Sequence, residues 1–118
     1  GKEMIYNNIH IYFLWLPFGQ GIVINSKRVL VQLVKDPTRT KVHLDSTCQV
    51  IQHELNHAEK IKEKGWIDFM ATTLWQYIFK NHDTAAYEPE AIKAESPIDQ
   101  ALKYTLRMYC INNNLEFY

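Results

Sequence analysis

The chain has 118 residues, of which 47% are hydrophobic and 22% are charged, as in ordinary globular proteins, so we expect a single domain over residues 1–118 with one core. Thirteen basic and thirteen acidic side chains give a formal net charge of zero. The basic residues are scattered and form no stripe, which argues against a nucleic-acid partner.

The first apolar run, residues 9–24, does not predict a membrane helix. Pro17 and Gly19 interrupt it, whereas a spanning helix needs about 20 consecutive apolar residues. No signal peptide is recognisable. We therefore expect no membrane association and a cytoplasmic location, and the sequence leaves the oligomeric state open.

Three segments of the first third predict β-strands. Residues 9–16, 22–24 and 28–34 are rich in β-branched and aromatic side chains, which favour strands. The last two are separated by residues 25–27 alone, a connection typical of an antiparallel hairpin. Residues 41–44 add a short strand. We expect a small N-terminal antiparallel β-sheet.

A helix is predicted from about residue 46 to residue 64. Ser46 and Gln49 match the capping-box pattern at its start, and Gly65 suits the position that follows a helix end. Within it, apolar residues recur at helical spacing beside His53 and His57. The two histidines should therefore border the face that packs on the core.

This helix carries an H-E-x-x-H motif from His53 to His57. Histidines at positions i and i+4 lie one turn apart on one face, so both imidazoles can reach one metal ion, with Glu54 beside it. Neutral imidazoles ligate Zn²⁺, the ion lowers the pKa of a bound water toward ~7, and a nearby carboxylate can take the proton. We therefore predict that His53 and His57 bind zinc and that Glu54 is the general base of a hydrolase.

Helices also follow the motif. Residues 66–80 are apolar around most of the helix circumference, which is typical of a core helix. The alternative is that Trp75 or Phe79 is exposed and forms a partner surface. A short helix is expected over residues 85–95. Ser96 as N-cap and Pro97 as the first helical residue predict the start of a last helix.

A catalytic zinc site uses three protein ligands and a water molecule, so one ligand must come from outside the motif. His82, Glu88, Glu90 and Glu95 all follow the apolar helix. We interpret His82 as an ordinary loop histidine and Glu95 as a solvated residue. The remaining histidines are interpreted as ordinary sheet residues: His10 and His43.

The motif, followed by Gly65 and Trp66, an aromatic helix and the sequence Tyr-Glu-Pro-Glu-Ala at 87–91, resembles the small gluzincin zinc metallopeptidases, including the minigluzincin-like short bacterial and phage members. These carry H-E-x-x-H on one helix and a later glutamate helix, often with an E-x-E-A pattern. The resemblance spans roughly residues 28–95. It implies a zincin-like α+β fold, in which the small antiparallel sheet packs on a helical bundle that contains the motif helix and the glutamate helix.

The same resemblance implies a His₂Glu site for Zn²⁺. In these families the first Glu, three residues before the Ala, is the third ligand, which is Glu88 before Ala91 in this chain. Pro89 departs from the pattern and fits only the first turn of a helix. Glu90 is therefore the second choice.

Together these features predict a zinc-dependent metallopeptidase that hydrolyses a peptide or protein substrate. The substrate would pair with an edge strand from residues 28–34 or 41–44. Three tyrosines are candidates for oxyanion stabilisation by residue type alone: Tyr87, Tyr104 and Tyr109. One alternative is a non-catalytic zinc-binding structural or interaction protein of the same fold, although such a site has no use for Glu54. The other is a metal-free interaction module.

Overall fold

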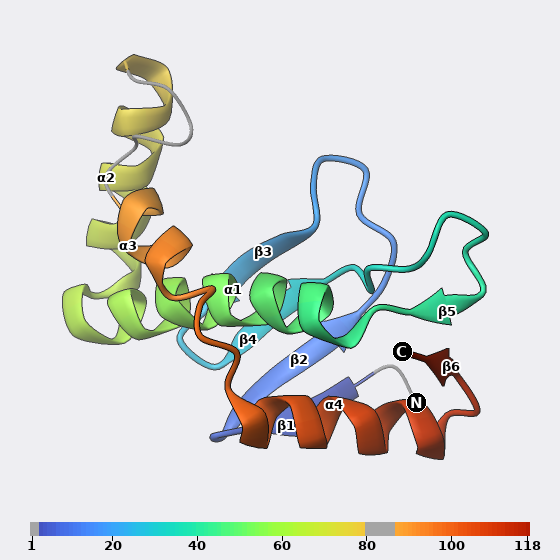
Figure 1. Ribbon diagram of the computed structural model, residues 1–118. Helices are drawn as coiled ribbons and strands as arrows, with labels where there is room; N and C mark the ends of the chain where they lie inside the picture. The colour runs from blue at the N-terminus through green and yellow to red at the C-terminus, as the bar shows by residue number, and fades with distance from the viewer. Residues whose placement is uncertain (1–2, 80–86) are drawn as a thin grey trace.

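The computed structural model describes residues 3–79 and 87–118, which form a mixed β-sheet and four helices (Figure 1). The broad α+β class is thus confirmed. In the four-stranded sheet the strands are β1 (Glu3–Tyr6), β2 (Ile9–Phe13), β3 (Gly21–Asn25) and β4 (Arg28–Val31). Their spatial order is β1-β2-β4-β3.

The expectation of a purely antiparallel sheet is wrong. The predicted hairpin is present as β3 and β4, but β4 runs parallel to β2. The reason is the route of residues 14–20, which carry the chain from β2 to the outer edge of the sheet. The hairpin then returns β4 into the space between β2 and β3.

The hairpin of β1 and β2 was not predicted in the strand pattern. Its turn consists of Asn7 and Asn8, which have φ angles of 50° and 63°. Two consecutive residues with positive φ form the type I′ turn that matches the twist of a two-residue hairpin, and Asn tolerates this conformation. The Asn-Asn pair was therefore the available sequence signal.

A second small sheet joins the C-terminal end of the chain to the start of the motif helix. Strand β5 (Lys41–Val42) pairs in parallel with β6 (Glu116–Phe117). The backbone N–H of Tyr118 donates to the carbonyl of Val42 at 2.9 Å, and that of Leu44 donates to the carbonyl of Tyr118 at 3.0 Å. This pairing anchors the first turn of the motif helix.

Helix α1 (Leu44–Lys64) carries the motif and packs on β3 and β4. It begins before the predicted Ser46 N-cap, because His43 caps it instead: His43 Nδ1 accepts the backbone N–H of Ser46 at 3.0 Å. His43 is therefore a capping residue and not a sheet residue. The predicted end is confirmed, since Gly65 has a φ of +90° and its N–H reaches the carbonyl of Ile61 at 2.8 Å.

Helix α2 (Trp66–Phe79) has the predicted position but not the predicted burial. Figure 1 shows it turning away from α1 near the C-terminal end of that helix and pointing away from the sheet. Phe69 is 2% exposed, whereas Leu74 and Trp75 are more than 60% exposed. The prediction of a core helix is therefore wrong. The structure agrees with the alternative, in which Trp75 and Phe79 are exposed.

The last two helices are α3 (Glu88–Lys93) and α4 (Gln100–Asn112). Pro89 lies in the first turn of α3, where proline is tolerated. The predicted start of α4 at Ser96 is wrong, because the carboxylate of Asp99 caps it by accepting the N–H groups of Ala101 and Leu102. In place of the expected helical bundle, α2, α3 and α4 each pack on α1.

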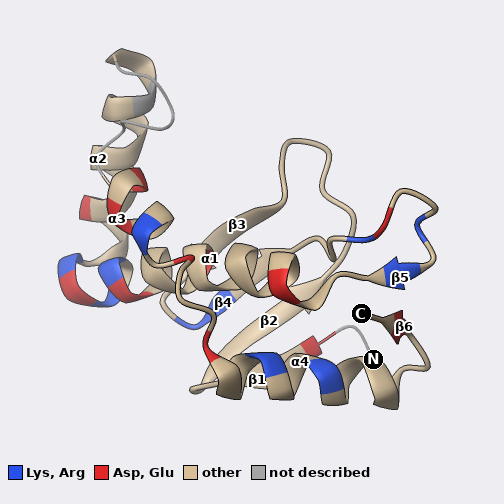
Figure 2. Cartoon of the chain, viewed as in Figure 1, with Lys and Arg blue, Asp and Glu red and all other residues tan. Residues whose placement is uncertain are grey.

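One core lies between α1, α4 and the sheet. Its fully buried side chains include Ile11, Val29, Ile51, Leu102 and Leu106. Figure 2 shows Lys interspersed with Asp and Glu over α1 and α3, whereas the charged residues of α4 are basic, Lys103 and Arg107. Across residues 3–79 and 87–118, no helix has the length and apolar character that a membrane crossing requires.

Candidate metal centre

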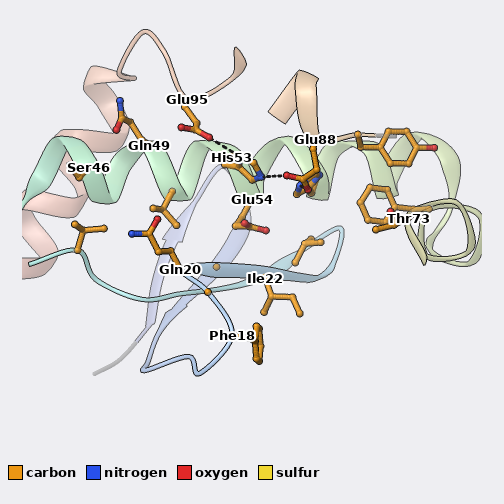
Figure 3. Close-up of a pocket in the computed structure, with 18 of the residues that line it drawn as sticks. Phe18, Gln20, Ile22, Ser46, Gln49, His53, Glu54, Thr73, Glu88 and Glu95 are labelled. Atoms are coloured by element: carbon orange, nitrogen blue, oxygen red, sulfur yellow. Dashed lines mark hydrogen bonds and ion pairs between the residues drawn. The ribbon is translucent and has the colours of Figure 1, made fainter. Parts of the chain in front are cut away.

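Two turns of α1 and the first residue of α3 bring three side chains of the motif region together (Figure 3). The Glu88 carboxylate lies between both imidazoles. Its Oε1 is 2.8 Å from His57 Nε2, and its Oε2 is 3.0 Å from His53 Nε2. The candidate ligand atoms of the three residues all lie within 4.8 Å of one another.

Local sequence explains this convergence. The spacing of four residues places His53 and His57 on the same face of α1. Glu88 is the first residue of α3, and the fully buried Ala91, one turn later, leaves room for α3 to approach α1. A larger side chain at Ala91 would push Glu88 away from the two histidines.

Burial makes the electrostatics of this cluster strong. Burial alone would raise the pKa of Glu88, but the hydrogen bonds from His53 and His57 outweigh it and hold the pKa well below its ordinary value. Burial would lower the pKa of His53, yet hydrogen bonds to Glu88 and Glu95 raise it to about 9. The buried carboxylate is thus stabilised as an anion, and binding of a metal ion would release a proton from His53.

The donor set fits a metal ion. Two imidazole nitrogens and one carboxylate oxygen are ligands that divalent transition metals accept, and around a tetrahedral zinc ion neighbouring ligand atoms lie about 3.3 Å apart. Each histidine pairs with a different oxygen of Glu88, at 2.8 and 3.0 Å, and the candidate ligand atoms lie within 4.8 Å of one another, so the three side chains must shift to surround one ion. In the described part of the chain, this is the group of His, Cys, Asp and Glu side chains that could hold an ion.

The other candidate ligands lie elsewhere. Glu90 is 53% exposed, and its Oε2 is 3.0 Å from Lys60 Nζ, so it points away from the histidines. His10 pairs with Glu3 at the sheet. His82 falls outside the described residues.

Glu95, interpreted from the sequence as a solvated residue, contacts the cluster directly. Its Oε2 lies 2.8 Å from His53 Nδ1 (Figure 3). The His53 ring is thus held between two carboxylates, Glu95 at Nδ1 and Glu88 at Nε2. The interpretation of Glu95 as solvated is therefore wrong.

Glu54 is buried beside the cluster and faces strand β3. A Cβ atom added to Gly21 would lie 2.8 Å from Glu54 Cγ and 3.1 Å from Glu54 Oε2. Glycine at this position therefore makes the room in which the carboxylate sits. Gly21 lies in another element, 33 residues before Glu54, and no local sequence pattern identifies it.

A cavity of about 690 Å³ opens onto the cluster. His53, Glu54, His57 and Glu88 line it together with Glu95. Its other walls are uncharged and come from the segment before β3, from β3, from the first half of α1 and from α2. Residues of these walls include Phe18, Gln20, Ile22, Gln49, Phe69, Met70 and Thr73. The candidate ligands and the candidate base therefore face a common open space.

The cavity also decides between the sequence candidates for substrate contacts. Strand β4 lies inside the sheet and β5 is paired with β6, so neither predicted segment is the strand edge at the site; β3 is that edge. Tyr87 lines the cavity, where it stacks on Phe69. Tyr104 is exposed and Tyr109 packs on Phe13 in the core, so both lie away from it.

Comparison of the chain with protein-family models, with curated proteins and with solved structures gave no match. The resemblance to gluzincins therefore depends on the sequence alone, through the H-E-x-x-H motif and the segment 87–91. The cluster of His53, His57 and Glu88 could hold a metal ion but does not by itself show a family.

Proposed function

We propose that this chain is a zinc-dependent metallopeptidase of the small gluzincin type, with a zincin-like fold. The observation that carries the proposal is the burial of Glu54 beside His53, His57 and Glu88, with all four side chains on the wall of one open cavity. A structural zinc site closes its fourth position with a protein ligand. A buried carboxylate next to three candidate ligands suits a hydrolytic site.

In this proposal His53, His57 and Glu88 hold the ion, and Glu54 moves the proton. When bound, zinc supplies a Lewis acid and lowers the pKa of water toward ~7. Glu54 accepts the proton of the attacking water and later gives it to the leaving amine. Its burial against Gly21 fixes the carboxylate in one position, so little reorganisation accompanies the transfer.

The expected substrate is an extended peptide that lies along the edge of β3. Edge strands offer unpaired N–H and C=O groups to which a peptide can add as a further strand. Strand β3 occupies the outer position of the sheet and lines the cavity through Gly21, Ile22 and Val23. A peptide added there would bring a carbonyl group next to the proposed metal centre.

A non-catalytic zinc-binding interaction protein is the second candidate. The exposed apolar side chains of α2 favour it, since exposed apolar patches mark interaction sites. Ile67, Leu74, Trp75, Ile78 and Phe79 are each more than 60% exposed. A partner on this surface would need no contribution from Glu54.

A peptide-library screen with the zinc-loaded protein separates the two candidates. We expect the parent to cleave peptides, and we expect Glu54→Gln to keep zinc but lose activity by about 10²–10⁴-fold, the usual contribution of a general base. Glu63→Gln is the matched control, since Glu63 lies on the same helix but is exposed and pairs with Lys60. A zinc-loaded parent that cleaves nothing would favour the non-catalytic candidate, and cleavage by Glu54→Gln at the parent rate would remove the proposed base.

A further inference from the structure

The contact between Glu95 and His53 joins segments 42 residues apart in the sequence. Glu95 follows the end of α3, whose C-cap is Ala94, and its backbone N–H donates to the carbonyl of Ile92 at 3.1 Å. Its side chain is one-third exposed, and its Oε2 lies 2.8 Å from His53 Nδ1. A further interaction holds this segment against α1.

That interaction is made by Gln52, the residue immediately before His53. Its Nε2 donates to the carbonyl of Ala94 at 2.8 Å and to the carbonyl of Pro97 at 3.0 Å. Its Oε1 accepts the backbone N–H of Asp99 at 2.9 Å. One side-chain amide thus fixes the backbone on both sides of Glu95 against α1.

The two histidines of the motif differ in this respect. His57 Nδ1 is buried and has no hydrogen-bond partner among residues 3–79 and 87–118. Its ring packs edge-on against Phe69, with 5.7 Å between ring centroids. His53 instead has a carboxylate at Nδ1, so its orientation depends on a polar contact that a substitution can remove without opening the core.

We propose that Glu95 is a positioning residue for the metal ligand His53 and that Gln52 sets its place. By accepting the Nδ1–H of His53, Glu95 fixes the tautomer that leaves Nε2 free to ligate and aims Nε2 at the point that Glu88 also faces. Carboxylates in this outer position orient ligating histidines and make them better donors, and their loss typically weakens metal affinity about 10–100-fold. The inference rests on the proposed function through its metal centre, but it does not require peptidase activity.

Zinc affinity, measured by competition with a chromophoric chelator, tests this role. We expect about 10–100-fold weaker binding for Glu95→Ala. Glu95→Gln should lie between Glu95→Ala and the parent, because its amide oxygen still accepts the Nδ1–H but carries no charge. Gln52→Ala should weaken zinc binding as well, since it frees the backbone around Glu95. Glu90→Gln is the matched control on α3, where Glu90 contacts Lys60 and not the histidines, and it should bind zinc like the parent.

Measurements on the zinc-free protein separate positioning from a general loss of structure. Far-ultraviolet circular dichroism of zinc-free Glu95→Ala and Glu95→Gln should match that of the zinc-free parent, so that the loss is confined to zinc affinity. Parent-like affinity in both Glu95 variants would overturn the inference and leave the metal centre intact. A parent that binds no zinc would overturn the inference and the metal centre together. Zinc binding that weakens as expected in a protein that cleaves no peptide would uphold the inference and reject the peptidase.

Discussion

Replacing Gly21 by alanine should impair catalysis without removing the metal ion. The new Cβ would lie 2.8 Å from Glu54 Cγ and 3.2 Å from Glu54 Cδ, whereas ordinary contacts begin at 3.4 Å. The Glu54 side chain must therefore recede by at least about 0.6 Å. A displacement of about 1 Å at a catalytic group can cost ~10²-fold in rate, so we expect kcat/KM to fall about 10–100-fold.

The assay is steady-state cleavage of a peptide found in the library screen, with zinc content measured on the same samples. The three atoms nearest to the new methyl group all belong to Glu54, and none belongs to His53, His57 or Glu88. Zinc content should therefore stay at the parent level. Overpacking should lower the free energy of unfolding by about 1–3 kcal/mol. Gly19→Ala is the matched control, because a Cβ there meets nothing within 4 Å. Parent-like activity of Gly21→Ala, in a protein that Glu54→Gln inactivates, would refute the proposed place of Glu54.

Three further predictions concern the fold. Leu102→Ala, at a fully buried position, should lower the free energy of unfolding by about 2–5 kcal/mol in a urea titration. Leu74→Ala, at a position that is 63% exposed, should change it by less than about 0.5 kcal/mol in the same titration. Equal losses would contradict the exposure of α2. Gly65→Ala should lower the melting temperature, since a φ of +90° strains any residue with a Cβ, and an unchanged melting temperature would exclude that backbone conformation. Burial and the hydrogen bond to Asp99 raise the pKa of Tyr6 to about 12. The stability that this tyrosine contributes is therefore complete below its unfolded pKa of about 10 and is lost as pH rises toward 12. Between pH 9 and pH 11, urea unfolding should show a smaller loss of stability for Tyr6→Phe than for the parent, and an identical loss would disprove the contact.

The parts of the site that lie close together in sequence were predictable. Two histidines four residues apart on a helix must share a face, so the placement of His53 and His57 follows from helix geometry alone. The preference for Glu88 over Glu90 came from the resemblance and not from a local rule, since Pro89 departs from the family pattern. In the structure Glu88 contacts His57 and Glu90 pairs with Lys60 at the surface. The end of α1 at Gly65 also follows from local backbone preference.

The parts that depend on distant segments were not predictable. An apolar helix is expected in the core, but its own sequence does not show whether another element covers it, and α2 points away from the sheet. The parallel pairing of β2 with β4 depends on the path of residues 14–20. Gly21 and Glu95 act through contacts with α1 across 33 and 42 residues, so neither leaves a local pattern in the sequence.

The most direct test of the central claim is the zinc content of the protein purified without added metal, measured by elemental mass spectrometry. We predict about one zinc per chain in the parent and in Glu90→Ala, and loss of zinc in His57→Ala and Glu88→Ala. Far-ultraviolet circular dichroism of each variant checks that it is folded. A parent that stays without zinc after dialysis against it, or a folded Glu88→Ala that keeps zinc at the parent level, would contradict the proposed His₂Glu centre.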